Sequence, residues 1–138
     1  MTIREKALAE FQRYRKEELG KETGFVQCPY CRRFLPWQNS VAVHYIPRQF
    51  RSLEVEPRNV YAGHSLCNGI DQQQSNNGEY HERFRQWIID NFGEWQVLWL
   101  ENRKRVLVKH GTHFYEELIK EIRENGRKSK EGKTESSC

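Results

Sequence analysis

Apolar side chains recur at helical spacing over most of the chain, except in one central stretch. Near the N-terminus, Ala7, Leu8 and Phe11 form one apolar face, and Thr2 with Glu5 has the spacing of a capping box. Gly20 is placed to end this helix, and Gly93 separates two later ones. The sequence therefore predicts helices over residues 2–19, 64–74, 79–92 and 94–104 and a last one from Thr112, with a turn at 75–78.

The central stretch, residues 25–61, has a different pattern. Residues 41–46 are apolar and β-branched enough for a strand, which Pro47 stops. Residues 48–59 are polar, and we interpret them as a loop that returns to a second short strand at Val60 and Tyr61. Residues 25–37 carry CPYC and are typical of a metal-binding knuckle with a short turn. The predicted fold class is therefore α+β and mainly helical.

The composition predicts a small hydrophobic core that needs a metal or a disulfide for stability. Of the 138 residues, 36% are hydrophobic and 30% charged, so one domain with a thin core is expected. Such cores usually need a metal or a disulfide. The net charge of +4 permits nucleic-acid binding without requiring it. Residues 126–138 are polar and of low complexity, which predicts a disordered tail.

The compartment bears on how the cysteines are used. The sequence has no N-terminal apolar segment of the kind that signal peptides carry, and no apolar run approaches the roughly 18 residues that a membrane span needs. We therefore expect a cytoplasmic protein with no membrane partner. In a reducing compartment, closely spaced cysteine pairs favour zinc over disulfides.

Four residues have the spacing of a zinc site. Cys28 and Cys31 form one pair, and His64 and Cys67 form a second with the same spacing, at the predicted start of a helix. Each pair can clamp one side of a tetrahedral ion, and four protein ligands leave no open position, so the zinc would be structural. The alternative is that Cys67 is a small buried residue and His64 an ordinary surface histidine.

A second set of residues has the chemistry of phosphodiester hydrolysis. His44, at the end of the predicted strand, is a candidate general base, and Asn59 could hold its other ring nitrogen. Asn68 directly follows Cys67 and could offer its carbonyl oxygen to a cation such as Mg²⁺ or Mn²⁺. Each residue alone has a more ordinary explanation in packing or capping. Their order inside a zinc frame is what favours a nuclease.

The loop between the two strands carries three arginines. Arg48, Arg51 and Arg58 lie among Glu54 and Glu56, and guanidinium groups can bind phosphate oxygens. We expect these arginines to contact DNA, although loop arginines are often merely solvated.

The motifs CPYC, AVHYIPR, EPRNVYAGHSLCN, SNNGEY and FGEWQVLWLE together resemble the NinG/Rap recombination endonucleases of lambdoid phages, an HNH family. The resemblance covers residues 1–125 with gaps. It implies one zinc-bound treble-clef or ββα-metal (HNH) finger at 25–75, between a helix at 1–20 and a helical part at 79–125. His64 stands where relatives usually have cysteine.

The resemblance also implies an activity. It places His44 on the general base, Asn59 on the middle Asn and Asn68 on the metal-binding Asn of a metal-dependent endonuclease. Such enzymes nick branched DNA, including Holliday junctions and D-loops, during phage recombination. Cuts in two opposed strands imply a homodimer, and a phage-encoded protein would act in the host bacterial cytoplasm.

Related nucleases often place an acid before the base, where this chain has residues 41–43, all apolar. Asp71 lies one helical turn after Asn68 and could supply a carboxylate for the catalytic cation, although a solvated helix Asp is the simpler interpretation. The missing acid favours an alternative function, a zinc-braced DNA-binding protein of the same ancestry with weak or no cleavage. A third hypothesis is a protein-interaction adaptor that uses its Trp-rich helices.

Overall fold

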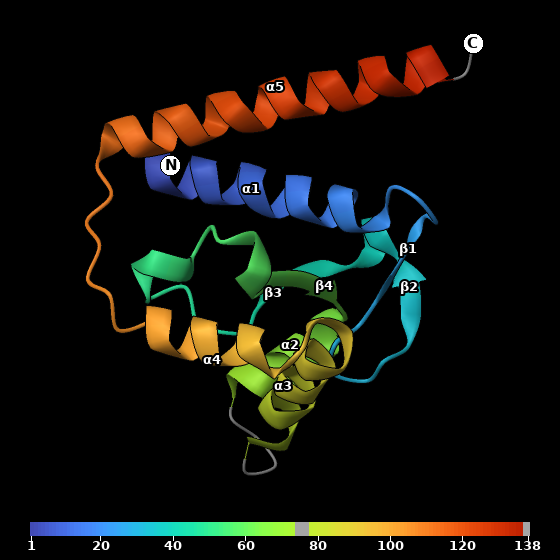
Figure 1. The fold of residues 1–138 in the computed structure, drawn as a ribbon, viewed down its shortest axis with the longest axis vertical. Helices are drawn as coiled ribbons and strands as arrows, with labels where there is room; N and C mark the ends of the chain where they lie inside the picture. The colour runs from blue at the N-terminus through green and yellow to red at the C-terminus, as the bar shows by residue number, and fades with distance from the viewer. Residues whose placement is uncertain (74–77, 137–138) are drawn as a thin grey trace.

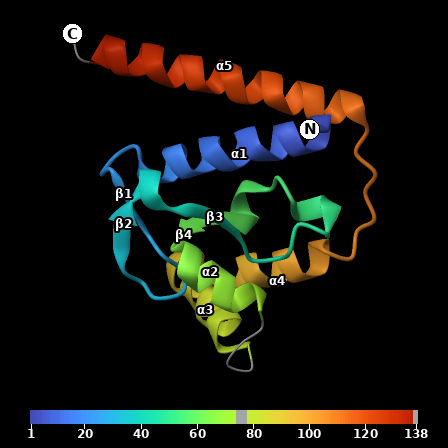
Figure 2. The ribbon, with the colours of Figure 1, turned by 180° about the vertical axis from the view of Figure 1, so that it is seen from behind.

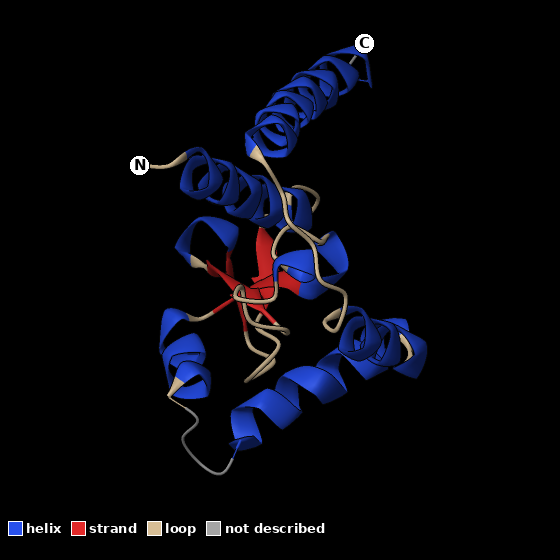
Figure 3. Ribbon diagram, turned by 90° about the vertical axis from the view of Figure 1, so that its left-hand side faces the viewer, coloured by secondary structure: helices blue, strands red, loops and turns tan. Residues whose placement is uncertain are grey.

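The computed structural model describes residues 1–73 and 78–136, with side chains described as far as residue 126. Helices make up most of the molecule, together with two small antiparallel sheets (Figure 3). The protein is therefore α+β and mainly helical, as the sequence predicted.

The first helix, α1 (Ile3–Gly20), begins at the predicted capping box. The Thr2 hydroxyl accepts a hydrogen bond from the Glu5 amide at 3.1 Å, and the Thr2 amide donates to the Glu5 carboxylate at 3.3 Å. The helix ends at Gly20, which is its last residue, one position beyond the predicted bound at residue 19. A Cβ at Gly20 would lie 2.5 Å from the Cβ of Trp37, so glycine is needed there for the close approach of the η1 turn (Trp37–Asn39).

The two sheets have two strands each. β1 (Phe25–Gln27) pairs with β2 (Phe34–Pro36), and the turn between them carries the CPYC motif. β3 (Val41–His44) pairs with β4 (Val60–Gly63), so that His44 lies opposite Val60.

β3 is shorter than the predicted strand over residues 41–46. The Tyr45 amide still bonds to the backbone oxygen of Asn59, at 3.0 Å. At Ile46, however, the Asn59 side chain replaces the neighbouring strand as hydrogen-bond partner, so the ladder stops.

Three helices follow β4, close to their predicted bounds. They are α2 (Ser65–Gln72), with His64 as its N-cap residue, α3 (Glu79–Phe92) and α4 (Glu94–Arg103). Gly93 has φ of +101°, a value that other residues rarely adopt, and this turn separates α3 from α4. Most of the predicted turn at 75–78 lies outside the described residues, as does residue 74 of the predicted helix.

The main core lies between β3–β4 and the helices beside them. α1 crosses one side of this sheet, and α2, α3 and α4 lie on the other side (Figures 1 and 2). Phe84 of α3 is completely buried, and its ring makes edge contacts with Tyr30, Tyr45 and Tyr61. Burial of a phenylalanine side chain contributes about 1.5–3 kcal/mol, so this aromatic group is a principal source of stability.

The last helix, α5 (Thr112–Ser136), lies against the outer side of α1 (Figure 1). A small separate cluster joins the two helices, in which Ala7 of α1 packs with Tyr115 and Ile119 of α5. The backbone is helical through Ser136, whereas the sequence predicted a disordered tail from residue 126. This segment is rich in Lys, Arg and Glu, which have high helix propensity. Residues 137–138 lie outside the described part.

Among the described residues, no helix is both long and apolar enough to cross a membrane. The tryptophans are divided between interior and surface. Trp87 is in the core, whereas Trp95 is 56% exposed.

Candidate functional site

The four predicted zinc ligands come together at one point. Cys28 and Cys31 lie in the turn between β1 and β2, His64 is the N-cap residue of α2, and Cys67 is in the first turn of that helix. Their ligand atoms all lie within 4.8 Å of one another. The site therefore joins the β1–β2 hairpin to the start of α2.

Backbone hydrogen bonds shape the turn that carries the first pair. The Cys28 amide donates to the Arg33 oxygen at 2.9 Å, and the Arg32 amide donates to the Cys28 oxygen at 2.8 Å. Arg32 has φ of +63°, the only positive φ among the described residues other than glycine. This conformation costs of order 1–3 kcal/mol for a residue with a side chain, and it closes the turn so that both sulfurs point toward α2.

The donor set fits a divalent metal ion. Cys31 Sγ lies 3.3 Å from His64 Nδ1, and Cys28 Sγ accepts a hydrogen bond from the His64 amide at 3.4 Å. Desolvation and the nearby sulfurs of Cys28 and Cys31 raise the pKa of the Cys67 thiol to about 12. Without a cation Cys67 therefore stays a neutral thiol, whereas a bound divalent ion would hold the sulfurs as thiolates, and Cys3His is a common donor set for structural zinc. The described cysteines form no disulfide.

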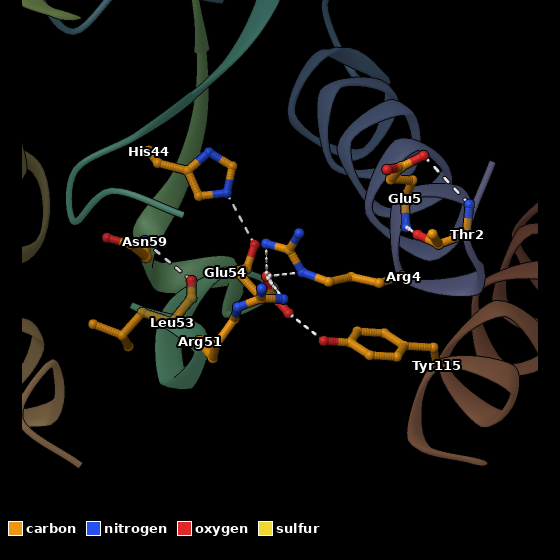
Figure 4. Close-up of polar contacts among 9 residues, drawn as sticks. All are labelled: Thr2, Arg4, Glu5, His44, Arg51, Leu53, Glu54, Asn59 and Tyr115. Atoms are coloured by element: carbon orange, nitrogen blue, oxygen red, sulfur yellow. Dashed lines mark hydrogen bonds and ion pairs between the residues drawn. The ribbon is translucent and has the colours of Figure 1, made fainter. Parts of the chain in front are cut away.

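His44, at the end of β3, is held by a backbone carbonyl. Its Nε2 lies 2.9 Å from the Glu54 oxygen (Figure 4). A carbonyl can only accept, so Nε2 carries the proton and Nδ1 keeps a free lone pair. Desolvation lowers the pKa of His44 below its ordinary value of 6.5, and the charge of Arg48 lowers it further, against the hydrogen bond to Glu54, which raises it. His44 is therefore a neutral imidazole at pH 7.

The prediction that Asn59 holds the ring of His44 is wrong. Asn59 is completely buried, and its side chain bonds to the loop backbone. Its Oδ1 accepts from the Ile46 amide at 2.8 Å, and its Nδ2 donates to the oxygens of Ile46 at 2.9 Å and Leu53 at 3.1 Å. Both polar atoms of the Asn59 side chain are therefore bonded to the backbone, and they fix the shape of loop 46–59. The ring of His44 is held instead by the backbone oxygen of Glu54.

A groove with a volume of about 1040 Å³ runs past His44. We call it the His44 groove, and the residues that matter for its chemistry are Gln12, His44, Arg48, Asn68, Asp71 and His81. Its lining residues come mainly from β3, the loop that follows β3, α2 and α3. The sequence-predicted base, the predicted metal-binding Asn and the tentative Asp71 therefore lie along the same groove.

Asp71 is oriented by two aromatic neighbours. Its Oδ2 accepts a hydrogen bond from the Tyr30 hydroxyl at 2.8 Å, and its Oδ1 lies 3.5 Å from Nδ1 of His81. Tyr30 stands between Cys28 and Cys31 in the sequence. The carboxylate is therefore connected through Tyr30 to the turn that holds the metal-binding pair.

His81 is a groove residue that the sequence analysis missed. Its ring stacks on Tyr45 with centroids 4.7 Å apart and planes 9° apart, which fixes its orientation beside Asp71. The pattern of residues 79–92 indicated an amphipathic helix, and His81 lies outside the apolar face that this pattern defines. No local signal distinguished it from a solvated residue.

The three loop arginines do not gather at one place. Arg48 lines the His44 groove. The Nη1 of Arg51 lies 3.8 Å from the Glu54 carboxylate, and its side chain is 44% exposed. Arg58 lies over the rings of Trp99 and Trp95, at 4.9 and 5.9 Å from their centroids. Of the three, Arg48 is the one placed beside His44.

Comparison with known proteins gives no match for this chain among family models, curated proteins or solved structures.

Proposed function

We propose that this protein is a metal-dependent, structure-selective DNA endonuclease that nicks branched DNA, such as Holliday junctions and D-loops, in phage recombination. The observation that carries the proposal is the His44 groove, which His44, Asn68 and Asp71 all line. The helix that carries Asn68 and Asp71 also carries Cys67 of the Cys–His cluster. β3, β4 and α2 follow one another as strand, strand and helix. That order supports a zinc-braced treble-clef or ββα-metal finger of the HNH kind.

In this proposal the Cys–His cluster holds structural zinc. Its four ligands come from the β1–β2 turn and from the start of α2, and Asn68 is the next residue after Cys67. A zinc ion bound there would fix α2 relative to the rest of the molecule. The side chains that α2 presents to the groove would then be held in place.

The hydrolytic step uses the free lone pair of His44. Nδ1 takes a proton from a water molecule, the water oxygen forms a bond to phosphorus, and the bond from phosphorus to the leaving oxygen breaks. The neutral imidazole and the fixed Nε2 proton both support this role. Asn68 and Asp71 would bind a Mg²⁺ or Mn²⁺ ion, which stabilises the charge on the leaving oxygen when it is bound.

DNA would reach the groove past Arg48, and Arg51 and Arg58 would contact phosphates outside it. All three side chains are exposed. Paired cuts in opposed strands of a junction need two active sites, so we propose a homodimer on DNA.

The test of this function uses a labelled four-way junction and a linear duplex of matched sequence, each incubated with the protein in magnesium and in chelator. Nicking of the junction in magnesium alone, faster than nicking of the duplex, is the expected result. Equal nicking of both substrates would contradict the proposal that the enzyme selects branched DNA.

A second function, DNA binding without efficient cleavage, is favoured by two observations. Residues 41–43 supply no acid before His44. In the described part of the chain, the Cys–His cluster is also the one group in which three or more His, Cys, Asp or Glu ligand atoms gather closely. A protein that binds the junction tightly but leaves it uncut at saturating magnesium or manganese would have this function.

The pH dependence of nicking should report on His44. Burial lowers its pKa below 6.5, and a base must be unprotonated to act, so the rate should rise with pH and level off with a midpoint below 6.5. Removing the charge of Arg48, which also lowers this pKa, should move the midpoint up toward 6.5. Single-turnover nicking with DNA well below saturation, which reports the pKa of the DNA-free protein, is measured from pH 5 to 8 for the wild type and for Arg48→Ala.

Arg13→Ala is the matched control for that comparison, because Arg13 is exposed on α1 and outside the groove. It should leave the midpoint unchanged. A midpoint above 6.5 in the wild type would contradict the assignment of the base.

Asp71→Asn should weaken the use of magnesium. We expect the nicking rate at limiting magnesium to fall tenfold or more, to order of magnitude, with partial recovery at excess metal. The amide keeps an oxygen that can accept from Tyr30, so the change removes the charge and replaces the oxygen beside His81 with an NH2 group. A magnesium titration of single-turnover nicking measures this effect.

Glu94→Gln, a change of an exposed acid at the start of α4, is the control and should have no effect. An unchanged titration in Asp71→Asn would leave Asn68 as the single protein ligand in the proposed site.

A further inference from the structure

Glu54 connects the candidate base to the two helices on the opposite side of the loop. Its backbone oxygen accepts the hydrogen bond from His44 Nε2, as described above. Its side chain extends away from His44 toward α1 and α5 (Figure 4). One residue therefore contacts His44 through its backbone and the helical layer through its carboxylate.

The carboxylate of Glu54 is fully buried, with side-chain exposure of 0%. Oε2 accepts from Nε and Nη2 of Arg4, at 3.0 and 2.8 Å, and Arg51 lies near the same oxygen. Oε1 accepts from the hydroxyl of Tyr115 at 2.7 Å. A buried carboxylate without partners costs several kcal/mol, so these contacts determine where Glu54 can lie.

The rest of the loop fixes this carbonyl only in part, because the Glu56 amide donates to the Leu53 oxygen at 3.3 Å across Glu54 and Val55. Asn59 bonds to the backbone of Ile46 and Leu53, and so it holds the loop up to the residue before Glu54. The direction of the Glu54 carbonyl depends in addition on its own side chain, which Arg4 and Tyr115 hold. Loss of either partner would let the residue turn and would weaken the hydrogen bond to His44.

We propose that Glu54 is a positioning residue for His44, and that Tyr115 of α5 holds Glu54 where its carbonyl fixes the Nε2–H tautomer of His44. Docking of α5 on α1 is then part of the active-site structure. The effect on nicking rests on the proposed function, whereas the effect on the His44 ring does not.

The packing of α5 explains why this coupling is specific. α5 contacts α1 through the small cluster with Ala7, and the apolar side chain of Ile119 fills part of that cluster. An exposed ion pair, Arg123 with Glu10 at 2.8 Å, adds a second attachment. Tyr115 is the residue of α5 whose polar group contacts the buried Glu54 carboxylate.

The test follows the His44 ring by its nitrogen-15 NMR shifts in the DNA-free, zinc-loaded protein, with the His44→Ala spectrum identifying its signals. The Nε2–H form should dominate in the wild type. Tyr115→Phe should raise the fraction of the Nδ1–H form, and Glu54→Gln should raise it more.

At saturating junction and magnesium, Tyr115→Phe should nick about threefold to tenfold more slowly, the effect of one lost hydrogen bond, with unchanged affinity for DNA.

Two controls separate positioning from general stability. Ile119→Val removes a methylene from the same helix and cluster, and Arg123→Ala removes the exposed ion pair, yet both keep the contact of Tyr115 with Glu54. Neither should change the tautomer of His44.

An unchanged tautomer in folded Tyr115→Phe and Glu54→Gln would overturn the inference. A shift in Ile119→Val as large as in Tyr115→Phe would overturn it too, because the effect would then be general loosening. A tautomer shift in the two variants, in a protein whose wild type never nicks DNA, would support the positioning and refute the proposed function.

Discussion

Cys31→Ser should yield a protein that purifies without zinc and has lost most of its cooperative thermal unfolding. The Cys–His cluster joins the β1–β2 hairpin to α2, and the described cysteines add no disulfide to help. Structural zinc sites contribute about 10–16 kcal/mol to folding, and a domain of this size has a total stability of about 5–15 kcal/mol. Loss of the metal is therefore expected to exceed the margin of stability.

The measurements are metal content of the purified protein, expected at about one zinc per chain in the wild type, and thermal unfolding followed by circular dichroism. Cys138→Ser is the control, since it changes the cysteine that belongs to neither metal-binding pair. A metal-free Cys31→Ser protein that unfolds cooperatively at the wild-type temperature would show that the Cys–His cluster does not stabilise the fold through a bound metal.

His44→Ala should abolish nicking and leave binding of a four-way junction nearly intact. A general base acts in the transition state, where it contributes about 10²–10⁴ in rate, and adds little to ground-state affinity. His44 is half-buried and its one ring bond goes to the Glu54 carbonyl, so alanine leaves a single backbone acceptor without its donor. The fold should therefore survive the change.

Single-turnover nicking and gel-shift affinity, measured on the same junction, separate the two effects. His113→Ala is the matched control, because His113 is exposed on α5. If the affinity of His44→Ala fell in parallel with its nicking rate, His44 would be a phosphate contact or a structural residue.

Much of the fold could be predicted because its signals are local. The capping box at Thr2 and the break at Gly93 each act over a few residues, and the structure has helices close to the predicted bounds. The paired spacing of the cysteines and His64 was equally local. Their meeting at one point followed from the chemistry of a metal site.

The polar connections of the loop could not be predicted, because they depend on residues far apart in sequence. Glu54 has the appearance of a loop acid among arginines, yet it is buried by Arg4, 50 residues away, and Tyr115, 61 residues away. The position of Asn59 next to a strand favoured a contact with His44. Only the folded loop shows that its amide faces Ile46 and Leu53 instead.

The residues that line the His44 groove could likewise be predicted only in part. Asn68 and Asp71 share a face of α2, which their spacing predicted. The addition of His81 required the packing of α3 against α2 and the stacking of its ring on Tyr45.

Withdrawal and return of magnesium, with zinc measured in the same samples, tests most directly whether the His44 groove cleaves DNA while the Cys–His cluster only supports it. Purified protein is dialysed into magnesium-free buffer, assayed on a labelled four-way junction, and assayed again after magnesium is restored. Nicking should stop and then return, while zinc stays at about one per chain. Zinc-loaded, folded protein that binds the junction but never nicks it in magnesium or manganese would contradict the proposed function, and so would nicking that follows the zinc content instead.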